Sequence, residues 1–128
     1  MGKTMQKVTG DFGEVTAALE VILRPYEKDL VLESSVSTGY SLSTRHVLPN
    51  NQKLFFAAYQ GRKAYVSYYL MPVYVFPDLL SRISADLRKR MQGKSCFNFK
   101  RVDPELFIEL AALTEAGFER YRIEGFLK

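Results

Sequence analysis

The chain has 128 residues, of which 47% are hydrophobic and 25% charged, and its formal net charge is +4. These proportions are typical of a globular domain and weigh against general disorder. The sequence contains one cysteine and one histidine, which excludes an internal disulfide and a zinc site built from Cys and His.

The beginning of the chain carries no apolar run like that of a signal peptide. No stretch approaches the roughly 18 continuous apolar residues of a transmembrane helix. We therefore expect a cytoplasmic protein without membrane association. Residues 1–9 are predicted to be a flexible N-terminus, and residues 10–128 a single domain.

The first predicted element is an amphipathic helix that begins near Asp11 and ends or kinks at Pro25, which could instead open a second short helix. Its apolar residues recur at spacings of three and four: Phe12, Val15, Leu19, Ile22, Leu23 and Tyr26. Residues 34–47 alternate with period two and predict one strand, in which Gly39 marks a bend or bulge. A turn is predicted at residues 49–51.

Residues 53–60 and 63–71 are two aromatic-rich runs joined around Gly61-Arg62, a pattern that predicts a β-hairpin. The second run has large side chains on both faces, which predicts a central strand covered on both sides. Residues 77–91 predict a helix with one apolar stripe, ended by Gly93.

The next predicted strand, residues 95–100, places Phe97 and Phe99 on one face and Cys96, Asn98 and Lys100 on the other. Asp103-Pro104-Glu105 predicts the start of a helix that ends at Gly117, and residues 118–126 predict a further short helix. Since no βαβ unit recurs, the fold class is α+β: a mainly antiparallel sheet with helices packed on it.

Segment 82–101 contains seven basic residues and one acidic residue. Such a segment is either a solvated helix face or a surface for anions or nucleic acid. The base-stacking pattern of RNA-binding sheets is absent, so no specific nucleic acid is expected. A small anionic ligand or a protein partner remains the expected kind of partner.

The sequence predicts no catalytic residue, no metal ligand and no cofactor. The phosphate-loop spacing is missing, because Arg88 occupies the position that would need glycine before Gly93-Lys94-Ser95. Cys96 and His46 form the one possible thiol–imidazole pair, and nothing in the sequence places them together. A lone cysteine on a strand is typically a small buried hydrophobe.

Residues 65–72, 91–100 and the helix from Asp103 to Thr114 resemble the YdhG-like domains of unknown function. The resemblance covers roughly Val15 to Tyr121, and Gly93, Lys94, Cys96 and Phe99 match its pattern. It implies a compact α+β fold with an antiparallel sheet flanked by helices. Some members are described as frataxin-like iron chaperones, which rely on an acidic ridge on the first helix and strand. Here the acids of the first helix are dispersed, so no iron ligand is carried over.

These observations predict a non-enzymatic binding or interaction module of the YdhG-like type. The alternatives are a frataxin-like intracellular iron chaperone and an enzyme acting on a small anionic substrate. The predicted pocket lies where the Cys96 face of its strand meets the central hairpin. Its candidate ligand-binding residues are Tyr68, Tyr69, Lys94, Ser95, Cys96 and Asn98, joined by His46 if the end of its strand folds alongside.

Overall fold

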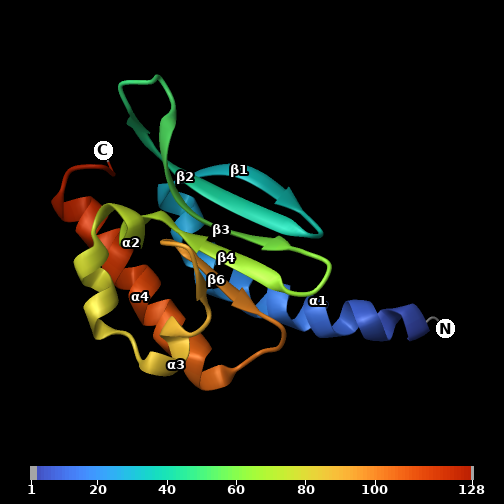
Figure 1. Cartoon of the computed structure of the whole chain (residues 1–128). Coiled ribbons are helices and arrows are strands. Elements are labelled where there is room, and N and C mark those ends of the chain that lie inside the picture. The colour runs from blue at the N-terminus through green and yellow to red at the C-terminus, as the bar shows by residue number, and fades with distance from the viewer. Residues whose placement is uncertain (1–2, 128) are drawn as a thin grey trace.

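Six antiparallel strands form one sheet in the computed structural model, which describes residues 3–127 and their side chains from Phe12 onward (Figure 1). The spatial order is β1-β2-β3-β4-β6-β5. The strands are β1 (Val31–Val36), β2 (Gly39–Val47), β3 (Lys53–Gly61), β4 (Val66–Leu70), β5 (Met91–Gln92) and β6 (Cys96–Phe99). The predicted α+β fold with a mainly antiparallel sheet is confirmed.

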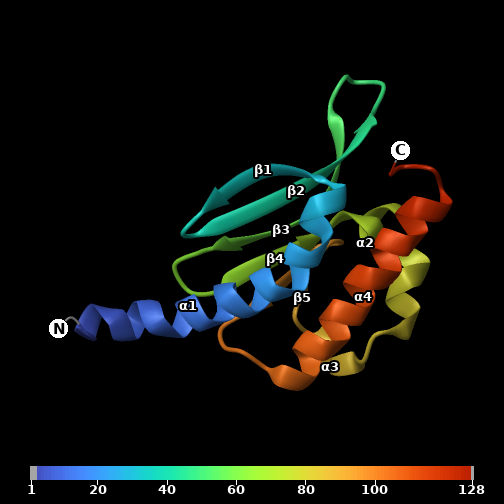
Figure 2. The same ribbon diagram turned by 180° about the vertical axis from the view of Figure 1, so that it is seen from behind.

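Two long helices, α1 (Lys3–Leu23) and α4 (Pro104–Ile123), lie against the same face of the sheet (Figure 2). The shorter helical segments are η1 (Arg24–Asp29), α2 (Met71–Val75), η2 (Pro77–Arg82) and α3 (Ala85–Arg88). None of the helices in residues 3–127 combines the length and apolar character needed to cross a bilayer.

The core lies between the sheet and these helices, and aromatic side chains fill it. Its largest fully buried members include Tyr68, Tyr121, Phe56, Phe97 and Phe99. Tyrosine hydroxyls connect the layers: Tyr59 donates to Glu20 of α1 over 2.8 Å, and Tyr121 of α4 donates to the carbonyl oxygen of Phe55 over 2.9 Å.

The predicted central hairpin forms, with Gly61 opposite Val66 and Tyr59 opposite Tyr68. Its second strand covers Val66–Leu70 rather than residues 63–71, because Met71 begins α2. β4 lies between β3 and β6, which confirms that it is a central strand. Its two faces differ. Tyr68 is fully buried on the helix side, whereas on the other side Ser67 is buried and Tyr69 is only half-buried.

The helix predicted to start near Asp11 begins instead at Lys3, so that prediction is wrong. Met5 and Val8 continue the spacing of Phe12 and Val15, and no proline interrupts the segment, so nothing stops the helix from extending. The predicted flexibility of residues 1–9 stays a prediction. After Leu23, a short 3-10 helix with proline in its first turn follows, which confirms the second short helix.

The single strand predicted over residues 34–47 is also wrong, because the chain reverses at Ser37-Thr38 and forms two paired strands. Gly39 begins β2 rather than forming a bulge. A Cβ there would lie 2.9 Å from Oε1 of Gln60, so a larger residue at this position would displace the end of the Gln60 side chain.

The helix predicted over residues 77–91 is broken into η2 and α3. Ile83 has an extended backbone, and the hydroxyl of Ser84 caps α3 by accepting from the N–H of Leu87 over 3.1 Å. Such a cap starts a new helix, which explains the break.

α4 begins at its predicted cap, where a carboxylate oxygen of Asp103 accepts from the N–H of Leu106 over 3.3 Å. It then passes through Gly117, so the predicted end there and the separate helix over 118–126 are wrong. A Cβ at Gly117 would lie 2.7 Å from Cβ of Pro72, so glycine allows α4 to approach α2 closely. The chain turns at Gly125, whose φ is +84°.

Candidate functional site

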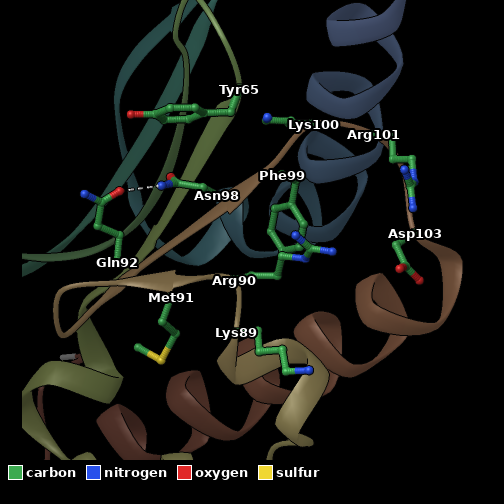
Figure 3. A pocket seen from close by; sticks show the side chains of 10 residues that line it. All are labelled: Tyr65, Lys89, Arg90, Met91, Gln92, Asn98, Phe99, Lys100, Arg101 and Asp103. Atoms are coloured by element: carbon green, nitrogen blue, oxygen red, sulfur yellow. Dashed lines mark hydrogen bonds between the residues drawn. The ribbon is translucent and has the colours of Figure 1, made fainter.

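A pocket of about 390 Å³ lies beside the hairpin formed by β5 and β6, and basic side chains dominate its wall (Figure 3). Its lining residues are Tyr65, Lys89, Arg90, Met91, Gln92, Asn98, Phe99, Lys100, Arg101 and Asp103. We call this the basic pocket. It lies at the edge of the sheet where β5 is the last strand.

The β5–β6 hairpin is what brings the basic residues together. Lys89 and Arg90 directly precede β5, and Lys100 and Arg101 directly follow β6. The N–H of Asn98 donates to the carbonyl oxygen of Arg90 over 2.8 Å, which extends the pairing to the end of the hairpin. Because the strands are antiparallel, the residues that precede β5 and those that follow β6 come to the same end of the hairpin, where all four line one pocket.

The charge of the pocket is unbalanced, with four cations against the carboxylate of Asp103. That carboxylate is engaged as the N-cap of α4. Lys89 lies 4.0 Å from Asp86. Among the side chains that the structure describes, Arg90, Lys100 and Arg101 form no ion pair. The pocket therefore has a positive potential that an anion would neutralise.

Two side-chain amides form a fixed polar part of the wall. Oδ1 of Asn98 accepts from the hydroxyl of Ser67 over 2.7 Å, while its Nδ2 donates to Oε1 of Gln92 over 2.9 Å. These bonds fix both amide orientations. They leave the second N–H of Asn98 and the amide nitrogen of Gln92 able to donate to a ligand.

The structure brings several predicted site residues together on the sheet face that turns away from the helices. Tyr69 lies opposite Cys96, and Ser67 lies opposite Asn98. The thiol of Cys96 donates weakly to Oδ1 of Asn98 over 3.4 Å. Of the predicted ligand-binding residues, Asn98 is the one that lines the basic pocket.

Cys96 is half-buried rather than fully buried as expected. Burial raises the pKa of its thiol above the ordinary value. Because the thiolate is the reactive form, a raised pKa leaves Cys96 a weak nucleophile at neutral pH.

The other predicted residues lie elsewhere. Tyr68 points to the helix side, where its hydroxyl meets that of Thr114 at 2.7 Å. The carbonyl oxygen of Ser95 accepts from the N–H of Leu70, and Lys94 lines a different pocket beside α2.

His46 does not join the Cys96 face. Ser41 is the β2 residue in the same cross-strand row as Cys96, and His46 lies five residues farther along β2. The ring of His46 packs against Phe126, with 4.9 Å between ring centroids. No described contact pairs the imidazole with the thiol.

Most of the residues that line the basic pocket were not predicted as site residues. The basic run over residues 82–101 is compatible with an anion surface, but its sequence favours a solvated helix face. The pocket could not be predicted because it depends on β5, a strand of two residues that is too short to give a period-two pattern. Among the side chains of residues 12–127, no group of three or more His, Cys, Asp or Glu lies close enough to hold a metal ion.

No family model, curated protein or solved structure matches this chain. The resemblance to YdhG-like domains therefore stays a prediction.

Proposed function

We propose that this domain is a non-enzymatic binding module that holds a small multivalent anion, phosphorylated or polycarboxylate, in the basic pocket. One observation carries the proposal: four cations from the two flanks of the β5–β6 hairpin line the same pocket as the hydrogen-bonded amides of Asn98 and Gln92. Guanidinium groups bind carboxylate and phosphate through paired, charge-assisted hydrogen bonds. A wall of this composition favours an anion over a neutral or cationic ligand.

The size of the pocket supports a small-molecule ligand. Its volume of about 390 Å³ lies within the range of roughly 300–1,000 Å³ that is common for ligand pockets. The environment of Cys96 favours binding over covalent catalysis, because burial raises the pKa of its thiol and the single imidazole lies elsewhere on the sheet. We therefore rank an enzyme acting on an anionic substrate second.

The iron-chaperone alternative receives no support from the described side chains, which form no cluster suited to a metal ion. If the YdhG-like resemblance is correct, it supplies a fold and no ligand. A chain with a single thiol also suits a reducing compartment, and we include a cytoplasmic location in the proposal.

The test is isothermal titration calorimetry with pyrophosphate and with citrate. The double variant Arg90→Gln/Arg101→Gln removes two cations from the pocket. The matched control Lys28→Gln/Lys53→Gln removes two exposed cations outside it. Since a hydrogen bond to a charged group contributes about 1.5–3 kcal/mol, we expect the pocket variant to lose at least tenfold in affinity and the control to lose little.

A second variant tests the same pocket in the opposite direction. Asp103→Asn keeps a side-chain oxygen to cap α4 and removes the opposing negative charge. We expect this variant to bind the anion roughly twofold more tightly, or better. If neither anion binds, or if the pocket and control variants weaken binding equally, the proposal is wrong.

A further inference from the structure

A second pocket, of about 470 Å³, lies beside α2 and has a different chemical character. We call it the α2 pocket. It shares Met91 with the basic pocket. Its lining residues are Val73, Tyr74, Pro77, Leu80, Arg88, Met91, Gly93 and Lys94.

Three parts of the chain build the α2 pocket. α2 and η2 supply the apolar wall, and Tyr74 of α2 is 54% exposed. Arg88, the last residue of α3, donates to the carbonyl oxygen of Leu80 over 2.9 Å, which holds its guanidinium beside the pocket. The turn between β5 and β6 supplies Lys94, directly after Gly93, whose φ of +79° lies in the left-handed region.

The charge on this wall has one sign. Arg88 and Lys94 are its charged members, and none of the described carboxylates lines it. Lys94 forms no ion pair with any described side chain. Arg88 uses one N–H for Leu80 and retains others for a ligand. The pocket therefore offers an apolar surface with two cations beside it, which complements a molecule that is apolar along most of its length and carries one negative group.

We propose that the α2 pocket binds an amphipathic carboxylate with a short aliphatic chain. Its carboxylate pairs with Lys94 and Arg88, and its chain lies along Tyr74 and the other apolar residues of the wall. This inference does not rest on the proposed function of the basic pocket, because the two walls share Met91 alone and the ligands differ in chemistry.

The chain length of the ligand provides the first test. Burial of each methylene group contributes about fourfold in affinity. Titrations with butanoate, hexanoate and octanoate, followed by amide chemical shifts, should therefore show affinity rising with length. The largest shifts should fall on Tyr74, Gly93 and Lys94. Octylamine, which has the same chain length and the opposite charge, should bind at least tenfold more weakly than octanoate.

Reversing one charge provides the second test. Lys94 is exposed, so Lys94→Glu should leave the fold intact, and the amide spectrum reports whether it does. Because Arg88 is retained, the wall of this variant has no net charge. The variant should therefore lose the preference for octanoate over octylamine, whereas the matched control Lys53→Glu should keep it. The Arg90→Gln/Arg101→Gln variant should bind octanoate as the unmodified protein does, which separates this proposal from the first.

Several outcomes would overturn the inference. The inference is wrong if octanoate binds nowhere on the protein, or if its chemical-shift changes map away from the β5–β6 turn. Equal binding of octanoate and octylamine by the unmodified protein would show that the cations play no part. Identical behaviour of Lys94→Glu and Lys53→Glu would show that the charge preference comes from the net charge of the protein and not from this pocket.

Discussion

The buried pair of hydroxyls between β4 and α4 gives the sharpest prediction about stability. Tyr68 and Thr114 are both 0% exposed, and their oxygen atoms lie 2.7 Å apart. Thr114 also donates to the carbonyl oxygen of Leu110 over 2.8 Å. Since a hydroxyl has one proton to donate, Tyr68 is the donor in the pair and Thr114 is the acceptor.

This assignment predicts unequal effects for the two single substitutions. Thr114→Val leaves the hydroxyl of Tyr68 buried without its acceptor, which costs about 1–3 kcal/mol in free energy of unfolding. Tyr68→Phe removes the donor and leaves the bond from Thr114 to Leu110 intact, so we expect a cost of about 0.5–1.5 kcal/mol. The double variant has no unpaired hydroxyl and should be more stable than Thr114→Val alone.

Urea unfolding of the unmodified protein, the two single variants and the double variant, followed by far-ultraviolet circular dichroism, gives the four free energies of unfolding that a double-mutant cycle needs. The coupling free energy of the double-mutant cycle should be favourable for the native pair. A Thr114→Val variant that is as stable as the unmodified protein would refute the reasoning. The reasoning would also be refuted if the double variant lost as much free energy of unfolding as the two single variants lose together, because the two hydroxyls would then act independently.

Two further predictions concern a close contact and a tyrosine. Gly117→Ala should cost about 1–3 kcal/mol, because the new Cβ would lie 2.7 Å from the ring of Pro72. Gly13→Ala in α1, where no described atom lies within 4 Å of the added Cβ, should stabilise the protein slightly. Equal changes in melting temperature for the two variants would contradict this reasoning. Burial and, as the second cause, the hydrogen bond to Glu27 raise the pKa of Tyr40 from 10.0 to about 12. The folded state therefore holds this proton more tightly, and the resulting stability, complete below pH 10, is lost as the pH rises toward about 12. Urea unfolding at several pH values in that interval should show a smaller fall in the free energy of unfolding for Tyr40→Phe than for the unmodified protein. An identical fall in the two proteins would exclude Tyr40 as a cause of the pH dependence.

Features of the fold with local signals could be predicted from the sequence. The central hairpin has two aromatic runs and a glycine between them, and the cap of α4 has aspartate followed by proline. Both signals depend on residues that are neighbours in the chain, and both predictions are confirmed. The turn at Ser37-Thr38 was missed because it contains neither glycine nor asparagine, the residues that usually mark a two-residue hairpin turn.

Other features depend on contacts between distant parts of the chain. Gly117 was expected to end a helix, since glycine disfavours helix interiors. Its role becomes visible only beside Pro72, which is remote in sequence and in close contact in space. The basic pocket is similar, because Arg90 and Lys100 reach the same pocket through a hairpin whose first strand is two residues long. A strand of that length gives no pattern that sequence reasoning can detect.

The two edges of the sheet differ in a way that favours β5 as the functional edge. β1 presents six residues at its edge, with a register shift between Leu32 and Ser34 and the charged Glu33 at that point. Irregular pairing and charge are devices that prevent an edge strand from joining another chain. β5 is too short to offer an edge for strand pairing, and both pockets lie beside it. The same two-residue strand therefore limits strand addition by another chain, and the basic residues that flank it remain available to bind a ligand.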